Sequence, residues 1–425
     1  MASTEESTEE SPENQPVAQG SQAHATDSGD DPGAWPCVGK DVPRTWTPSS
    51  DRRVPRADRS VVFAPSLPSA IARRTVRLAP ATLATVEQAA IALARADAHG
   101  GPATVALLRS ESAASSKVEH IEANQRYIAR ALAGLPTRQR AALEVAANLD
   151  ALQAALDAAD RPITPATIND IHRRLLPEED WSGAIRSEQN WIGGSDHSPR
   201  DARYVPPDPN RVAPLMEDLV AFINREDIPV VAHAGIVHAQ FEVIHPYADG
   251  NGRVGRALFH LVLRRRDVTT ISIAPLSIAF LGHGDTYLDS VRVYERGDID
   301  QYLTFFAECC RTAAAASVRL ADTMTELVRE WQTITAVART RSDSVLHRVV
   351  PDLPTYPVID AAAVSQRYGV SRRAAGTALD TLENAQILNR TTAARNHQIY
   401  EAHEVFAAIE DIERDVRAGR LSWSQ

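Results

Sequence analysis

One short stretch of the chain, His245 to Arg256, combines residue types that can accept a proton, hold a metal ion and bind phosphate. It reads His-Pro-Tyr-Ala-Asp-Gly-Asn-Gly-Arg-Val-Gly-Arg. A histidine can act as a general base near neutral pH, a carboxylate suits a hard cation, and a guanidinium group binds phosphate through several N–H donors. The residues that carry these chemistries are His245, Asp249, Arg253 and Arg256.

The elements on either side of this stretch decide where its groups point. An apolar, alanine-rich segment, 231–244, precedes it, and a second helical pattern, 254–264, follows. Between them Gly250, Asn251 and Gly252 form a tight turn without bulky side chains. The backbone N–H groups of such a turn and the N-terminus of the next helix converge on one anion site. The pattern therefore predicts a helix–loop–helix with the parts that phosphoryl-type transfer requires.

The stretch resembles the signature loop of the Fic (Fic/Doc) family, His-Pro-Phe-x-(Asp/Glu)-Gly-Asn-Gly-Arg-x-x-Arg, and departs from it only at Tyr247. Most Fic enzymes transfer AMP from ATP to a Ser, Thr or Tyr hydroxyl of a protein, and some relatives transfer other phosphate-containing groups. The resemblance implies a protein adenylyltransferase with ATP as substrate and Mg²⁺ as cofactor. The residues alone also fit a glycine-rich turn between two helices with charged surface groups.

The resemblance implies a role for each residue of the loop. His245 takes the proton from the attacking hydroxyl, and Asp249 holds a magnesium ion against the phosphates. Tyr247 anchors the loop in the core, provided that its hydroxyl finds a partner. The residues expected to contact the nucleotide are Gly250, Asn251, Gly252, Arg253, Arg256 and, beyond the loop, Tyr287.

A second segment, 107–120, resembles the inhibitory helix that precedes many Fic domains, with the pattern (Ser/Thr)-x-x-x-Glu-(Gly/Asn). Ser115 and Glu119 match this pattern, and His120 departs from it. In the family the glutamate pairs with the second arginine of the loop, here Arg256, and keeps it from the γ-phosphate. The alternative is that Glu119 is a solvated charge on a helix surface.

The segment 183–194 has glycines at both ends and alternating character between them, which predicts a short hairpin. It resembles the Fic flap, an edge along which a target segment lies as an added strand. The residues expected to dock the target are Asn190, Trp191 and Ile192. The alternative is an ordinary loop in which Trp191 is a packing anchor.

Composition limits the remaining possibilities. The net charge of −10 argues against a general polyanion-binding surface. The three cysteines, two of them adjacent at Cys309 and Cys310, do not form a disulfide framework. The polar, acidic N-terminus does not read as a signal peptide, and no apolar run has the length of a membrane span. We therefore expect a cytoplasmic protein that does not bind membranes.

The fold class predicted is mainly α, a Fic-type helical bundle with a small β-hairpin flap and a C-terminal winged helix-turn-helix domain. The expected divisions are a disordered acidic tail over 1–50, an N-terminal helical region with the inhibitory helix over 51–160, a Fic catalytic domain over 161–335 and the winged helix-turn-helix domain over 346–418. No strand-rich region is expected before the C-terminal domain.

The C-terminal prediction rests on a helix over 360–368, a turn at Gly369, a second helix over 371–384 and two short strands at 387–390 and 398–400. Cations able to face phosphates are Arg367, Arg372, Arg373, Arg390 and Arg395. Winged helices also mediate protein contacts, so DNA and protein remain alternative partners of this domain.

Three functions follow from these patterns. The first is an adenylyltransferase, inhibited by Glu119, that modifies an unknown protein, with self-modification and a homodimer expected. The second is a DNA-binding regulator whose Fic body senses a nucleotide. The third is a Fic transferase with another phosphate-containing donor, because the loop binds the phosphates that all such donors share. An intact His245 favours an enzyme over a sensor.

Overall fold

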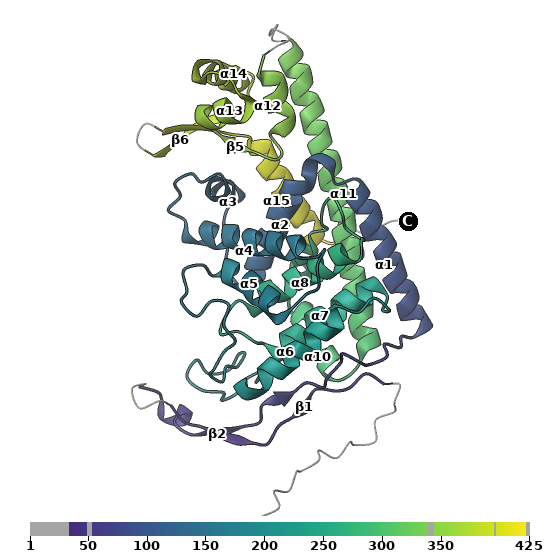
Figure 1. The fold of residues 1–425 in the computed structure, drawn as a ribbon. Coiled ribbons are helices and arrows are strands. Elements are labelled where there is room, and N and C mark those ends of the chain that lie inside the picture. The colour runs from purple at the N-terminus through teal and green to yellow at the C-terminus, as the bar shows by residue number, and fades with distance from the viewer. Residues whose placement is uncertain (1–33, 49–52, 338–343, 395–396, 422–425) are drawn as a thin grey trace, which may run out of the picture. The chain divides into compact units, whose positions relative to one another are not determined.

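The computed structural model describes residues 34–48, 53–337, 344–394 and 397–421 (Figure 1). Two units divide the chain, Met1–Ala34 and Trp35–Gln425, and of the first only Ala34 is described. The described residues form fifteen α-helices and three small antiparallel sheets, so the fold is mainly helical. None of these helices combines the length and the apolar character needed to cross a membrane.

Two central helices, α7 and α8, carry the loop at 245–250 (Figure 1). They pack against one another, α4 covers α8, and α6 covers α7. Nearly every residue of α7 is buried, which explains its continuous apolar sequence. The helices around them are α1 Pro80–Ala98, α2 Thr104–Val118, α3 Gln125–Leu132, α4 Arg140–Asp157, α5 Pro165–Leu175, α6 Pro209–Ile223, α7 Val230–Ile244, α8 Asn251–Arg265, α9 Leu276–His283, α10 Asp285–Glu295 and α11 Ile299–Val337.

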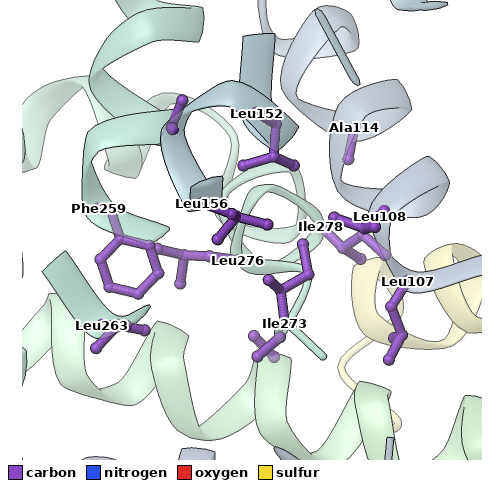
Figure 2. Packing of buried hydrophobic residues seen from close by; sticks show 14 of the residues in the cluster. Leu107, Leu108, Ala114, Leu152, Leu156, Phe259, Leu263, Ile273, Leu276 and Ile278 are labelled. Atoms are coloured by element: carbon purple, nitrogen blue, oxygen red, sulfur yellow. The ribbon is translucent and has the colours of Figure 1, made fainter. Parts of the chain in front are cut away.

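Helix α2 is a core element rather than a surface appendage. Figure 2 shows its Leu108 beside Ile278 of α9, and both side chains are buried. Leu107 is fully buried, and α2 packs against α4, α8 and α9. This packing fixes the position of the last turn of α2 and therefore of Glu119, the C-cap residue that follows it.

The two helices predicted on either side of the loop, over 231–244 and 254–264, are confirmed as α7 and α8, with ends shifted by up to three residues. The prediction of a disordered tail through residue 50 is wrong for residues 34–48, and the rest of that tail lies outside the described residues. Trp35 is buried and its ring contacts Phe222 and Tyr294. The prediction relied on the polar composition of the whole segment, and a single buried tryptophan changes that composition very little.

No strand-rich region precedes the C-terminal elements among the described residues, but short strands that the sequence did not predict do occur there. Four short strands precede α1, and they pair as β1 with β4 and β2 with β3. They are too short to show a strand period. Their bounds are β1 Gly39–Lys40, β2 Arg44–Trp46, β3 Val61–Phe63 and β4 Ser66–Leu67.

The prediction of a hairpin within 183–194 is wrong, because the described residues of this segment do not pair with one another. Its only strand-like pairing among the described residues is a single bridge from Ile192 to Tyr204. Ile192 donates to and accepts from the backbone at 203–204 with N···O distances of 2.8 Å. The glycines at both ends have positive φ, 76° at Gly183 and 77° at Gly194, so they bend the chain away rather than close a turn.

The C-terminal elements occur in the order helix, turn, helix, strand, strand, as expected. Gly369 ends the first helix in the left-handed region at φ 67°. The three-stranded sheet has the order β5-β7-β6. The bounds are α12 Leu346–Asp352, β5 Val358–Ile359, α13 Ala361–Tyr368, α14 Arg372–Asn384, β6 Asn389–Ala394, β7 His397–Glu401 and α15 His403–Arg417.

Candidate active site

The loop between α7 and α8 begins and ends with left-handed backbone. His245 closes α7 at φ 51°, and Gly250 opens α8 at φ 75°. A Cβ atom at Gly250 would lie 2.8 Å from Leu175 Cδ2, so the position requires glycine both for its φ and for its space. His245 has no such freedom, and its backbone conformation must be maintained by the surrounding contacts.

Side chains of the loop supply part of that support. Asn251 accepts from the Tyr247 amide and donates to the Tyr247 carbonyl, both at 2.9 Å. The Tyr247 ring is buried and stacks on His172 at 3.8 Å between centroids. Its hydroxyl donates to Asn169 Oδ1 at 2.8 Å. The tyrosine that replaces the family's phenylalanine therefore has the partner that its burial requires.

Two positioning residues outside the loop were missed from sequence. The Arg186 guanidinium is buried and donates to the carbonyls of His245, Glu188 and Pro207. His172 bridges through both ring nitrogens, with Nε2 3.0 Å from the Asp249 carbonyl and Nδ1 accepting from the Gly183 amide at 2.8 Å. No local pattern marks such residues, because their partners lie far away along the chain.

The His172 tautomer follows from these contacts. Nδ1 must accept and Nε2 must donate, which only the neutral ring can do. Burial lowers the pKa of His172 to about 4, and the Asp249 carbonyl only partly opposes this shift. The ring is therefore neutral at physiological pH and holds the Asp249 backbone in place.

His245 is also neutral near pH 7. Burial, together with the nearby Arg186 charge, lowers its pKa to about 4. Its Nδ1 is buried and forms no hydrogen bond with any described residue. A neutral imidazole can accept a proton, so the state of His245 suits a general base.

Asp249 is the exposed carboxylate of the loop, with 68% of its side chain accessible. Its Oδ1 accepts from the Gly250 amide at 2.6 Å. The amide of Gly250, expected in the anion hole, is thus engaged by Asp249, whereas the first amides of α8 have no partner within the helix. No cluster of three metal-ligating side chains occurs among the described residues. A metal ion at Asp249 would therefore need further oxygen ligands from a bound phosphate, a ligand set that fits Mg²⁺.

The two arginines of the loop differ in their hydrogen bonding. Arg253 is 3% exposed, and its Nε and Nη1 atoms have no partner among the described residues. It lines a cavity of about 340 Å³ together with Asp249 and Trp181. Arg256 is equally buried but fully engaged. It donates to the hydroxyl and carbonyl oxygens of Ser115 at 2.9 and 2.8 Å.

Glu119 completes the environment of Arg256. Its Oε1 lies 2.9 Å from Arg256 Nη2. A Cβ atom at Gly252 would lie only 2.1 Å from the same oxygen, so the carboxylate rests on the first turn of α8. Burial opposes the charged form, but Arg256 outweighs it and holds the pKa of Glu119 below its ordinary value. The carboxylate is thus ionised and lies against the N-terminus of α8.

The departure at His120 has a structural explanation. Helix α2 ends in a Schellman motif, in which His120 N bonds to Lys117 O and Ile121 N bonds to Ser116 O, both at 3.0 Å. The C′ residue of this motif is left-handed, and His120 has φ 61°. Glycine and asparagine adopt this conformation most easily, which accounts for the family's preference. Histidine meets the same geometry with some strain.

The remaining predicted residues have mixed surroundings. Tyr287 is buried, stacks on Phe280 at 4.1 Å, and its hydroxyl lies 3.4 Å from Arg256 Nη1.

Among the residues expected to dock the target, Asn190 donates to the Tyr247 carbonyl at 3.1 Å. Trp191 donates to the Ser195 carbonyl and contacts Trp46 of β2, so it packs as an anchor. Ile192 is 37% exposed. Whether these residues bind nucleotide or target stays a prediction.

Comparisons with known proteins agree with this geometry. Residues 162–263 match the Fic/DOC family. The proteins named protein adenylyltransferase Fic of Aedes aegypti and of Culex quinquefasciatus are 31% and 30% identical over 152 residues, which make up 35% of this chain and 28% and 27% of theirs. The matched segment thus spans less than a third of the length of these relatives.

A solved structure also resembles the chain. The crystal structure of a Fic family protein from Desulfovibrio desulfuricans G20 has a TM-score of 0.50 at 19% identity. The match covers 77% of this chain and 97% of that protein. At this identity the likeness concerns the fold alone.

The strain at His120 is open to measurement. Replacing His120 by glycine should stabilise the protein by about 1 kcal/mol, the usual cost of a side chain in the left-handed region. Chemical or thermal unfolding followed by circular dichroism measures this change. The matched control is His99→Gly, since His99 ends α1 with a right-handed φ of −90°. Equal effects at the two positions would show that His120 is not strained.

Proposed function

We propose that this Fic/DOC family protein, a distant relative of the protein adenylyltransferases, transfers AMP from ATP to a Ser, Thr or Tyr hydroxyl of a protein. The observation that carries the proposal is the convergence at the start of α8 of a neutral His245, an exposed Asp249 and the buried Arg253. A base, a carboxylate for a metal ion and a phosphate-binding cation are the parts that the reaction needs. The acceptor protein is unknown, and self-modification and a homodimer remain predictions.

The proposed reaction is a single displacement at the α-phosphorus. The acceptor oxygen forms the new P–O bond, the bond to the β-phosphate breaks, and diphosphate leaves. The acceptor proton passes to the His245 imidazole. The free amides at the N-terminus of α8 stabilise charge on the α-phosphate, and Arg253 binds the outer phosphates. Mg²⁺ bound at Asp249 would neutralise phosphate charge.

The pairing of Glu119 with Arg256 supports an autoinhibited resting state. Ser115 takes two of the hydrogen bonds of Arg256 and Glu119 takes a third. A γ-phosphate would have to compete with these partners for the same guanidinium. ATP would then bind with its α-phosphate out of line with the acceptor hydroxyl.

A second candidate function is DNA binding by the C-terminal elements. Arg372 and Arg373 are exposed in the first turn of α14, and neither forms an ion pair with any residue that the structure describes. Other predicted cations are engaged, because Arg390 pairs with Asp380 and Glu383 and Arg367 stacks on Tyr356. Arg395 lies outside the described residues.

The test of the enzyme is incorporation of labelled AMP into the protein itself. Glu119→Gly should raise incorporation by about ten- to a hundredfold, because a blocked state favoured by 1.4 to 3 kcal/mol is removed. Adding His245→Ala to this variant should reduce the rate by a factor of about 10² to 10⁴. Intact-mass spectrometry with each nucleotide identifies the group transferred. Absence of any nucleotide transfer by Glu119→Gly would refute the proposal, and a donor other than ATP would favour the third alternative.

The pH dependence tests His245 as the base. The base must be neutral, so the rate should be constant above its pKa and fall as the pH decreases through about 4. The measurement is single-turnover transfer by Glu119→Gly, which removes the Glu119 carboxylate, with circular dichroism as a check on folding. Burial raises the pKa of nearby Glu242 to about 7, so Glu242→Gln is the control. A limb near pH 7 that disappears in this control would belong to Glu242, whereas loss of the limb near pH 4 in Glu242→Gln would contradict His245 as the base.

Binding to duplex DNA tests the second candidate. The affinity of the full chain should fall steeply with salt, and Arg372→Ala with Arg373→Ala should weaken it and reduce the salt slope by about 2. Arg390→Ala is a matched control, since its guanidinium is already paired within the protein. No binding at low salt would leave protein contact as the role of this domain.

A further inference from the structure

The segment that contains Glu119 is ion-paired to the C-terminal elements on both of its flanks. On one side, Lys117 Nζ of α2 lies 2.6 Å from Glu413 Oε1 of α15. On the other side, Arg130 and Arg126 of α3 lie 2.6 and 3.3 Å from the carboxylate of Glu401 in β7. Three carboxylate–cation contacts thus connect residues 117–130 with residues 401–413. We call these five residues the latch.

The two ends of the latch differ in strength. Glu401 is 1% exposed and Arg130 7%, so breaking this pair leaves a buried charge without a partner. The pair of Lys117 with Glu413 is more accessible to solvent, with 27% and 21% of the two side chains exposed. Beside Glu401, Ala129 of α3 packs with Phe406, Val358 and Ile399 in a small apolar cluster separate from the main core. The contact of α3 with the C-terminal elements thus combines ion pairs with a small apolar cluster, while α15 also buries Val405, Ile409 and Ile412 in the main core.

A buried cation opposes the same contact. Arg109 of α2 is 1% exposed, and its Nε and Nη2 atoms have no hydrogen-bond partner among the described residues. Its guanidinium carbon lies 5.8 Å from the centre of the Phe406 ring of α15. Burying a cation without an acid nearby costs free energy that one aromatic contact only partly offsets. The contact of α15 with α2 therefore includes a cost at Arg109, which the ion pairs of the latch and the apolar packing of α15 offset together.

We propose that the latch holds Glu119 on Arg256, so that the C-terminal elements set the strength of the autoinhibition. The geometry requires this coupling, because Lys117 precedes Glu119 by two residues and also accepts the Schellman hydrogen bond from His120. A shift of α15 and β7 loosens both flanks of the segment and frees Arg256. This inference rests on the proposed function. It makes the C-terminal elements a control on the transferase site rather than a separate module.

Charge reversal across Lys117 and Glu413 tests the latch in the full-length chain. Lys117→Glu and Glu413→Lys should each raise AMP incorporation about five- to tenfold, at the low end of ordinary coupling between sites. The double variant restores the pair with reversed polarity and should return incorporation to within about twofold of the wild type. Asp415→Asn is the matched control, because it breaks an ion pair to Arg420 at 2.6 Å that does not involve α2 or α3.

A second set of variants distinguishes a failure of the latch proposal from a failure of the proposed function. In the Glu119→Gly background the latch substitutions should add nothing, since the inhibitory carboxylate is already gone. Glu413→Gln provides a milder break if charge reversal disturbs folding, which circular dichroism reports. Singles as inactive as the wild type, next to an active Glu119→Gly, would overturn the latch and leave the transferase intact. An inactive Glu119→Gly would overturn the transferase itself.

Discussion

The buried guanidinium of Arg256 is the constraint around which the site is arranged. A cation that is 2% exposed needs partners for all of its N–H groups. Ser115, Glu119 and Tyr287 supply them, from α2, the turn after it and α10. Burial alone would lower the pKa of Arg256, but Tyr287, Glu119 and Glu242 together raise it, so the charge is retained. The apolar packing of α2 in the core brings Ser115 and Glu119 to this charge.

The same constraint explains how one residue can be both structural and regulatory. In the resting geometry Glu119 stabilises Arg256, and a nucleotide phosphate would offer the same guanidinium an equivalent anion. Exchange of one anion for another costs little electrostatically, whereas removing Glu119 without a replacement leaves the cation uncompensated. Arg253, with two buried nitrogen atoms that have no partner among the described residues, could donate to a phosphate in either case. Under the proposed function, a carboxylate and a phosphate would therefore compete for this guanidinium.

Rigidity of the loop has a different origin. Asn251 forms hydrogen bonds within the loop. His172 connects the loop to α5, and Arg186 connects it to the segment that follows α5. These contacts maintain the left-handed backbone of His245, which would otherwise be unfavourable. They are neutral or fully buried and vary little near physiological pH. Preorganised amides and a fixed imidazole are what an electrostatic transfer site requires.

Local chemistry in the sequence was sufficient for the main helices and for the loop residues. The helical patterns over 231–244 and 254–264 predict α7 and α8, the two helices that carry the loop. Gly250 is required by its positive φ, and Asn251 is required by its hydrogen bonds to the backbone of Tyr247 in the same loop. Both requirements involve residues that are close in the sequence. The pairing of Ser115 and Glu119 with Arg256 was expected only from a family resemblance.

Only the tertiary structure decided the contacts between segments far apart in the chain. Trp35 orders residues that composition assigned to a disordered tail, since a single buried ring outweighs a polar neighbourhood. The glycine-bounded segment 183–194 pairs with residues 203–204 instead of with itself. The ion pairs of Glu401 and Glu413 with α2 and α3 span more than 250 residues of sequence, and no local pattern records such a separation. Long-range electrostatics and packing fixed these features, whereas periodicity and turn geometry fixed the elements themselves.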